Sequence, residues 1–588
     1  MKPVFPGAVC LWTNAALAAG IWASFLAPFL LLIATADRGL EMTDEGSYLL
    51  IAQNPWFTLG HGTFFGFALH PLWLLSGQHL APFRILGFVL GAGVGWVFAR
   101  ALELRLGRTT GLRGWMRAGL YGGMMVASLG IYVDGIRTLC YNWLAWCGGS
   151  LFLAAILCPE NQGWRRWMWT GLGALGWVIL LLGKWGAALV LLVGVVGVLF
   201  FRRAKEKGFF EDRSRLLSIL GTGTVAAVLA GWAVGWAGLA DTLESGVLIS
   251  RETGSHGFWL IRKYGWEIFY YFYRLGRAFV WILPLGWLVW WGWKKVSGKP
   301  PDFLHFAPAV FLLGASLALL RGYGVGGTLA FSKESIIAGA WWLGVVWVSW
   351  KTVGLSLPDP AAWRSVVILV TAPFLLGIGT NTSLADYAGH ATLLTLAGGW
   401  LVAQRLLGSA PPQAWLAIVF SAAVLQGTRL VTSLDHSYRL GSLWEQSAWL
   451  ATGPEKGRLR VRPEFADFLK HLDAELRQAG FSPGSPVAGI SDLCGVVYLA
   501  GGVSPGVPWF FGQVSGQKPY SQAVLAWLPG PVLEKVWVFR SQATLLSGDV
   551  ASFWPAATRV EVPRLVSVVS GLPTESGQTA MEIYRPAP

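Results

Sequence analysis

Long apolar segments recur along the first 430 residues of this chain. A bilayer core about 30 Å thick needs about 20 apolar residues per helix. About thirteen segments approach that length, at residues 10–36, 85–103, 117–134, 140–157, 167–183, 186–201, 215–238, 278–293, 305–320, 335–350, 365–380, 391–406 and 414–430. The 588 residues are 54% hydrophobic and only 13% charged, which is unlike a soluble protein. We therefore predict an all-α polytopic membrane bundle.

The basic residues form short clusters between the apolar segments. The formal net charge is +14, but the arginines and lysines do not gather on one soluble face, so we do not expect nucleic acid as a partner. With Lys2 inside, the clusters near residues 105–117, 165–166, 202–207 and 294–299 fall on the cytoplasmic side. This predicts a cytoplasmic N-terminus, with the first apolar segment kept as a helix, and an outer C-terminus.

The largest segments outside the predicted helices all fall on the outer side. They are residues 37–84, 239–277 and the tail 431–588, so we divide the chain into a membrane domain at 1–430 and a soluble domain at 431–588. In the first loop we expect two short helices along the membrane surface. In the tail, helical "PEFADFLKHLDAELRQAG" is followed by strand-like "VAGIS", "VVYLAGG", "KVWVFRS", "TRVEVP" and "MEIYRP", which predicts an extracytoplasmic α/β domain.

Five cysteines lie scattered at positions 10, 140, 147, 158 and 494. Their spacing indicates neither a disulfide framework nor a metal site. The tail must therefore fold without covalent or metal cross-links.

Two adjacent carboxylates, Asp44 and Glu45, begin the first outer loop in "TDEGSY". Polar groups beside a membrane are costly unless they serve a site or find partners. A site for proton transfer would use such a pair, and a helix cap at the water interface would look the same.

A lone cation, Lys184, stands between two apolar runs in "WVILLLGKWGAALVLLVG". We expect it at the outer turn of a helical hairpin, where it either contacts a ligand or extends to the interface as lysines do at helix ends. Asp134, Arg137, Tyr141 and Asn142 mark another outer turn, in "VDGIRTLCYNWLAW". An ordinary loop with a satisfied ion pair would explain these four residues equally well.

Further polar side chains fall at outer helix ends. The third loop combines basic residues with many aromatics, as an aromatic belt at the headgroup level also would. Together the outer groups suit a lipid-linked phosphate, since cations neutralise phosphate and a carboxylate can accept a proton. No Walker loop, zincin helix or Rossmann fingerprint accompanies them. The candidates are His70, Arg251, His256, Arg262, Lys263, Arg321 and Asn381.

The order of these motifs resembles polytopic glycosyltransferases of the GT-C type. The stretches that carry the resemblance are "TDEGSY", "HPLWLL", "APFRILGFVLGAGVGWVFAR", "IRTLCYNWLAW", "LLGKWGAAL" and "FRRAKEK". They cover roughly the first 210 residues and are similar to protein O-mannosyltransferases and lipid A aminoarabinose transferases. Beyond them the resemblance is one of topology and an outer C-terminal domain.

The resemblance implies an enzyme of the bacterial inner membrane that moves a sugar from a polyprenyl-phosphate carrier to an acceptor at the outer face. It assigns catalysis to Asp44, with Glu45 beside it and Tyr48 one helical turn further on, and donor-phosphate binding to Lys184. We expect four further cations to help bind the donor phosphate: Arg137, Arg251, Arg262 and Lys263. Where many members carry an acid, this chain has Asn142, which argues against a second catalytic acid and a carboxylate-bound metal. No cofactor is implied, and a divalent cation stays open.

Two other functions fit the same residues. A transporter or flippase for a lipid-linked saccharide would also need outer cations and interfacial aromatics. A non-catalytic membrane assembly protein would use its tail to bind a partner. A transporter should place polar groups where both sides can reach them, whereas the groups found here lie on one side.

Overall fold

The structure is a computed structural model. It describes residues 7–58, 62–107, 114–133, 135–159, 163–200, 209–252, 262–269, 291, 295, 360–379, 384–406, 412–452, 457–490, 492–508, 517–542, 550–552, 554–555, 560–574 and 577–587. The predicted helices at 305–320 and 335–350 lie outside these residues, as does nearly all of the one at 278–293.

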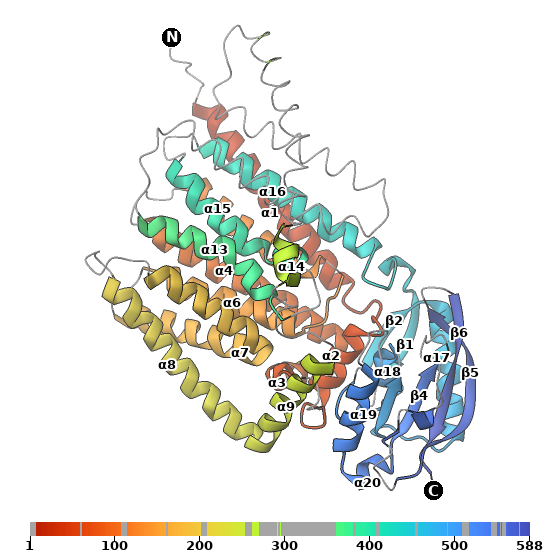
Figure 1. Cartoon of the computed structure of the whole chain (residues 1–588). Helices are drawn as coiled ribbons and strands as arrows, with labels where there is room; N and C mark the ends of the chain where they lie inside the picture. The colour runs from red at the N-terminus through yellow and green to blue at the C-terminus, as the bar shows by residue number, and fades with distance from the viewer. Residues whose placement is uncertain are drawn as a thin grey trace.

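Apolar helices pack into a bundle that occupies one side of the molecule (Figure 1). Three of the described helices are long and apolar enough to cross a membrane, at Leu11–Ala34, Leu80–Leu106 and Gly163–Val198, so the chain is an integral membrane protein. Its described helices are α1 (Gly7–Ala34), α4 (Leu80–Gly107), α5 (Gly114–Ser128), α6 (Tyr141–Leu157), α7 (Gly163–Phe200), α8 (Phe209–Val234), α9 (Trp236–Glu252), α13 (Pro360–Gly377), α14 (Leu384–His390), α15 (Thr392–Leu406) and α16 (Pro412–Asp435).

Helix α7 contains one backbone break, at Lys184. Its φ of −159° and ψ of 74° leave helical geometry, while the residues on both sides stay helical. The predicted segments 167–183 and 186–201 are therefore two helical halves that meet directly at this lysine.

The loop between α1 and α4 forms two short helices, as predicted: α2 (Asp44–Gln53) and α3 (Phe65–Leu75). Helix α2 is covered by other parts of the protein, because Glu45 to Ala52 are all buried. Gly46 lies so close to α18 (Cys494–Leu499) that an added Cβ would meet the Gly495 nitrogen at 2.2 Å. Close contact between two glycines thus lets the C-terminal region cover this helix.

The C-terminal region combines two sheets with helices (Figure 1). Strands β1 (Ala448–Thr452) and β2 (Gly457–Val461) pair antiparallel. A four-stranded sheet has the order β3-β4-β6-β5, from β3 (Val487–Ile490), β4 (Trp537–Ser541), β5 (Arg564–Thr574) and β6 (Gly577–Arg585). Strands β3 and β4 run parallel, and the other pairs are antiparallel. Its helices are α17 (Pro463–Gln478), α18, α19 (Gln517–Trp527) and α20 (Gly530–Leu533).

Sequence patterns identified only part of this region. The predicted helix and the strands in "VAGIS", "KVWVFRS" and "MEIYRP" are present as α17, β3, β4 and β6. The predicted strand in "VVYLAGG" is wrong: residues 494–499 form α18, whose packing on α2 overrides the strand preference of its valines. In "TRVEVP", residues 560–563 belong to no strand.

Backbone hydrogen bonds attach the C-terminal region to the loop between α1 and α4. The Gly39 N–H donates to the Arg460 carbonyl at 2.7 Å, and the Arg460 N–H donates to the Asp37 carbonyl at 2.7 Å. The Gly495 and Gly506 N–H groups donate to the carbonyls of Met42, at 2.6 Å, and Phe57, at 2.8 Å. The loop is therefore enclosed between the bundle and the C-terminal region.

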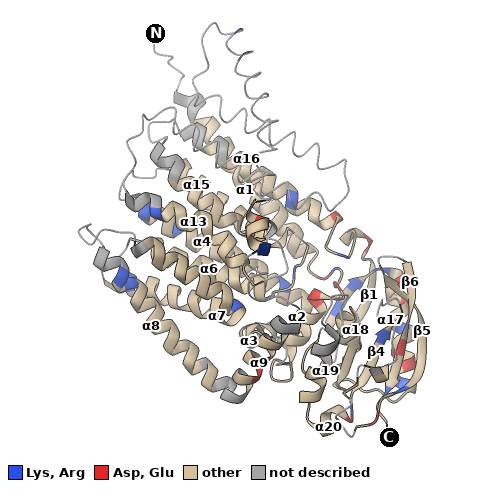
Figure 2. Ribbon diagram, in the orientation of Figure 1, with Lys and Arg blue, Asp and Glu red and all other residues tan. Residues whose placement is uncertain are grey.

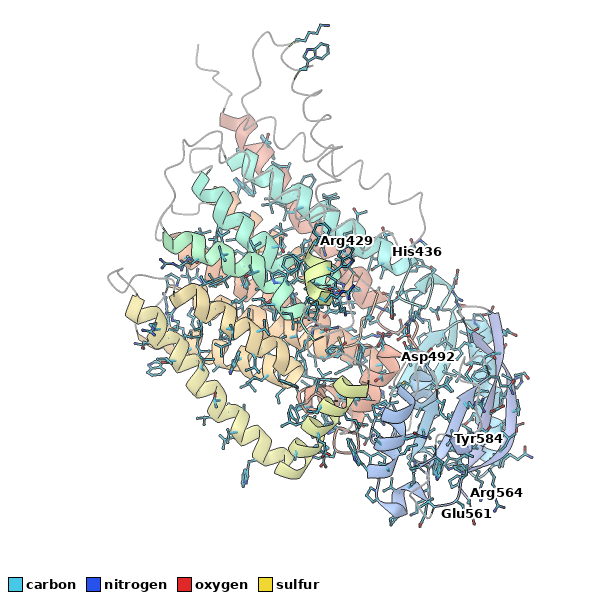
Figure 3. All side chains as sticks on the ribbon, in the orientation of Figure 1. Arg429, His436, Asp492, Glu561, Arg564 and Tyr584 are labelled. Carbon is cyan, nitrogen blue, oxygen red and sulfur yellow. The ribbon has the colours of Figure 1, made fainter. Side chains whose placement is uncertain are left out.

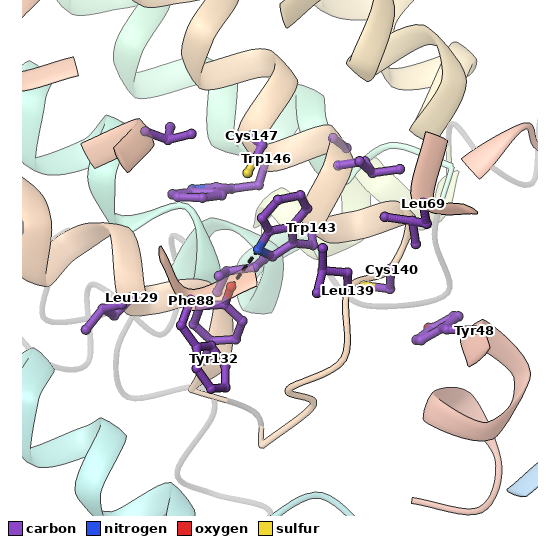
Figure 4. Packing of buried hydrophobic residues seen from close by; sticks show 14 of the residues in the cluster. Tyr48, Leu69, Phe88, Leu129, Tyr132, Leu139, Cys140, Trp143, Trp146 and Cys147 are labelled. Carbon is purple, nitrogen blue, oxygen red and sulfur yellow. Dashed lines mark hydrogen bonds between the residues drawn. The ribbon is translucent and has the colours of Figure 1, made fainter. Parts of the chain in front are cut away.

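One apolar core extends from the bundle into the C-terminal region. Figure 4 shows its centre, where the Trp143 indole donates to the Tyr132 hydroxyl at 2.6 Å, and Tyr48 lies at its edge. Charged residues are sparse along the bundle helices and frequent in the C-terminal region (Figure 2). The few charges buried near the loop therefore stand out.

Candidate active site

Glu45 is the centre of a fully buried ion pair. The Arg84 guanidinium, at the start of α4, lies 2.8 Å from the Glu45 carboxylate, and both side chains are 0% exposed. The other Glu45 oxygen accepts from the Arg137 N–H at 3.0 Å, the Thr138 N–H at 2.9 Å and the Thr138 hydroxyl at 2.8 Å. We call Glu45, Arg84, Arg137 and Thr138 the Glu45 anchor.

The two arginines of the anchor also hold the chain that leaves α1. Arg84 donates to the carbonyls of Ala36 and Gly39, each at 2.9 Å. Arg137 donates to the carbonyls of Thr35, at 2.5 Å, and Arg38. The Arg137 guanidinium, predicted to bind donor phosphate, is thus occupied by backbone carbonyls.

Electrostatics keep Glu45 ionised. Burial raises the pKa of its carboxyl, but Arg84, Arg137 and the hydrogen bonds outweigh burial and hold the pKa below its ordinary value. Burial, followed by the nearby Arg84 charge, lowers the pKa of Arg137 to about 9. Glu45 therefore serves as a counter-ion and is not poised to accept a proton.

Glu41 caps helix α2. Its carboxylate accepts from the N–H groups of Thr43 at 2.9 Å, Asp44 at 2.5 Å and Glu45 at 3.1 Å, and from the Thr43 hydroxyl. These are the N–H groups that a helix start leaves unpaired. Burial, and then Asp44, raises the pKa of Glu41 to about 7. Because Glu41 provides the cap, the carboxylate of Asp44 does not have to.

Asp44 instead faces the C-terminal region. Its side chain is partly buried, and it accepts a hydrogen bond from the Tyr438 hydroxyl. Burial raises the pKa of Asp44 above its ordinary value, Arg439 opposes this rise, and Asp492 adds to it. Figure 3 shows Asp492 at the junction between the bundle and the C-terminal region. Asp44 is therefore a carboxylate with a raised pKa at an interface, a common setting for a catalytic base.

Lys184 lies in a second polar site inside the bundle. Its ammonium donates to the Leu376 carbonyl at 2.9 Å and lies over the rings of Tyr387, at 4.5 Å, and Tyr141, at 5.8 Å. The residue is only 4% exposed. In the part of the chain that the structure describes, no carboxylate forms a salt bridge with it. We call Lys184, Tyr141, Tyr387 and the Leu376 carbonyl the Lys184 site.

Aromatic rings lie between helix α2, which carries Asp44, and the Lys184 site. Tyr48, one turn after Asp44, packs edge-to-face against Tyr141 of the Lys184 site at 5.8 Å and against Phe65 at 5.9 Å. Burial, and then Asp44, raises the pKa of Tyr48 well above its ordinary value. The His70 side chain contacts α2, since its Nδ1 lies 2.8 Å from the Ala52 carbonyl. Tyr48, on the same helix as Asp44, thus contacts the Lys184 site through Tyr141.

The other predicted residues fall into three groups. The Asn142 carbonyl accepts from the Tyr387 hydroxyl at 3.2 Å, beside the Lys184 site. In the third loop, Arg251 lies at the end of α9, Arg262 is exposed, and Lys263 is 3.9 Å from Glu267. Lying outside the described residues are Asp134, His256, Arg321 and Asn381.

Several residues of the site were not predicted. Glu41 precedes the acidic pair of "TDEGSY" by three positions. Arg84 is the one charge in residues 80–99 of α4, and a charge in an apolar stretch is a recognised signal of a site or a partner. Tyr438 and Arg439 carry no local signal, because only the fold brings residues about 395 positions apart together. Within the described ranges, no group of three or more His, Cys, Asp or Glu could hold a metal ion.

Comparisons with known proteins give matches among solved structures only. No family model matches the chain, and no curated protein does. ArnT from Cupriavidus metallidurans in the apo state is 14% identical with a TM-score of 0.37, and the match covers 98% of both chains. The same protein bound to undecaprenyl phosphate is 15% identical with a TM-score of 0.34, again over 98% of both chains. Both similarities extend over 98% of the chain at low sequence identity.

Proposed function

We propose that this protein is a GT-C type glycosyltransferase that moves a sugar from a polyprenyl-phosphate donor to an acceptor at the outer face of a bacterial inner membrane. The observation that carries the proposal is that three neighbouring carboxylates have different partners. Glu45 forms an ion pair with Arg84, and Glu41 caps helix α2, while Asp44 lies at the interface with a raised pKa. This supports Asp44 as the residue that accepts a proton.

The proposed reaction needs a base at the acceptor. A neutral hydroxyl is a poor nucleophile, and a positioned carboxylate that takes its proton typically contributes about 10²–10⁴-fold in rate. Asp44 takes the acceptor proton while the acceptor oxygen bonds to the anomeric carbon. The bond from that carbon to the carrier phosphate breaks, with inversion when attack comes from the opposite side.

The leaving phosphate needs a cation. Lys184 supports this role because its ammonium has a carbonyl and two ring faces around it but no described carboxylate salt bridge. A phosphate oxygen would supply the missing counter-charge. The apolar helices on both sides of Lys184 suit a polyprenyl chain.

Transfer from labelled donors tests the proposal. Purified full-length protein in nanodiscs is incubated with radiolabelled polyprenyl-phosphate sugars and candidate lipid, glycan and protein acceptors. We expect Asp44→Asn to lower transfer by about 10²–10⁴-fold because it removes the base and keeps the shape. The matched control is Asp467→Asn, on the exposed face of α17, which should transfer like wild type.

Two results would contradict the proposal at different levels. Near-normal transfer by Asp44→Asn would show that Asp44 is not the catalytic base, but the protein would still be a glycosyltransferase. The second result concerns the wild type. If it transfers sugar from no donor but moves intact donor across the membrane of reconstituted vesicles, a transporter is favoured.

A further inference from the structure

A tight turn of the C-terminal region reaches the first outer loop beside Asp44. The Ser437 N–H donates to the Gly441 carbonyl at 3.0 Å and closes the turn, with Arg439 near its tip at a φ of +53°. The Ser437 hydroxyl donates to the Gly135 carbonyl at 3.2 Å, which attaches the turn to the segment of the Glu45 anchor. Residues 437–441 are therefore fixed relative to Asp44.

The side chains of this turn point at the acidic start of α2. The Arg439 guanidinium donates to the Thr43 hydroxyl at 2.6 Å and lies 3.9 Å from the Glu41 carboxylate. It also covers the Tyr438 ring at 4.9 Å, and the Tyr438 hydroxyl donates to Asp44. One cation and one hydroxyl from the C-terminal region thus meet the two acids.

The charges around Asp44 make Arg439 the group that balances them. Of the described groups that face Asp44, Glu41 comes from the loop, Glu45 from α2 and Asp492 from the residues before α18. Glu45 is paired with Arg84, which leaves Glu41, Asp44 and Asp492 sharing Arg439. Its side chain is 39% exposed, so the turn stays accessible to water while it makes these contacts.

We propose that Tyr438 and Arg439 are positioning residues of the active site, which orient the Asp44 carboxylate and keep it ionised for proton transfer. This inference rests on the proposed function of Asp44. It makes the site composite, since the base comes from the first outer loop and the groups that control it come from the C-terminal region. An opposite charge within about 4–6 Å lowers the pKa of a carboxyl by about 1–3 units.

The sign of the expected pH effect follows from these charges. Asp44 accepts protons only when ionised, so transfer is lost as the pH falls through its pKa. Removing Arg439 raises that pKa, and the acidic limb of the rate profile moves to higher pH. Arg439→Met should therefore shift the limb upward by about one unit, Arg439→Lys by much less, and Tyr438→Phe by an intermediate amount.

Carbodiimide labelling measures the charge of Asp44 without any substrate. The reagent modifies protonated carboxyls, and mass spectrometry of the full-length protein in nanodiscs, from pH 5 to 8, gives the labelling midpoint at Asp44. We expect this midpoint to rise by about one pH unit in Arg439→Met and to return close to wild type in Arg439→Lys. The control is Arg477→Met, an exposed arginine paired with Asp473 on α17, which should leave the midpoint unchanged.

The outcomes separate this inference from the function on which it rests. An unchanged Asp44 midpoint in Arg439→Met, with the protein folded, overturns the positioning role and leaves Asp44 as the proposed base. A shifted midpoint with a shifted rate profile and an unaltered donor KM supports it. A shifted midpoint in a protein that transfers no sugar overturns the glycosyltransferase and shows that Arg439 controls the charge of Asp44 alone.

Discussion

The Glu45 anchor and the Lys184 site both bury cations among apolar helices, but they balance the charge in different ways. Arg84 has a carboxylate at 2.8 Å, and its guanidinium also donates to backbone carbonyls and to the Thr138 hydroxyl. Lys184 has one carbonyl and two tyrosine rings, with no salt bridge to a described carboxylate. A fully paired charge stabilises the fold, and a charge that lacks its counter-ion is available to an anionic ligand.

Breaking the anchor should have the largest effect on stability. Glu45→Gln leaves Arg84 and Arg137 buried without their counter-ion, and removing one partner of a buried pair typically costs about 3–5 kcal/mol. We expect a strongly lowered thermal midpoint in detergent, measured by intrinsic fluorescence. Asp44→Asn, one residue away, should melt like wild type. Equal midpoints for wild type and Glu45→Gln would show that the anchor does not hold the loop.

The pH dependence sharpens this prediction. The pKa of Glu45 is depressed in the folded protein, so its contribution is fully present above the unfolded value of roughly 4.3 and is lost as the pH falls through the folded value. The difference in thermal midpoint between wild type and Glu45→Gln should therefore stay constant above about pH 5.5 and shrink in acid. A difference that grows in acid would contradict the assignment of Glu45 as the ionised partner.

A smaller effect is expected where α2 meets α18. An added Cβ at Gly46 would lie 2.2 Å from the Gly495 nitrogen, and backbone cannot move aside as a flexible side chain can. Overpacking of this kind typically costs about 1–3 kcal/mol. Gly46→Ala should therefore lower the thermal midpoint, whereas Gly93→Ala in α4, with nothing within 4 Å of its added Cβ, should not. Equal midpoints for both variants would mean that α2 and α18 separate readily.

The sequence predicted those parts of the fold that periodicity determines. Apolar length located most of the described bundle helices but missed α9, which was expected to be loop, and the short α14; the charged pattern of residues 463–478 located α17. Residues 494–499 were misjudged because valine-rich runs favour strands locally, while here the contact with Gly46 decides their conformation. Burial of α2 was missed for the same reason, since the covering region lies about 450 residues further along the chain.

The candidate site divides in the same way. Asp44 and Lys184 could be predicted because each is a charge beside an apolar segment. The separate roles of Asp44 and Glu45 could not, because they depend on Arg84, Glu41 and Arg439, which reach the pair only in the folded protein. Arg137 was predicted to bind phosphate because its side chain is cationic, but in the structure its guanidinium donates to backbone carbonyls.

The affinity of Lys184→Met for a polyprenyl phosphate tests most directly whether Lys184, a cation without a described counter-ion, binds the phosphate of the ligand. A charge-assisted hydrogen bond contributes about 1.5–3 kcal/mol, so the affinity of the variant should fall by about 10-fold or more, while its thermal midpoint stays at or above that of wild type. Lys470→Met, at an exposed lysine of α17, is the control and should bind like wild type. Unchanged affinity in Lys184→Met, with the protein folded, would contradict the account.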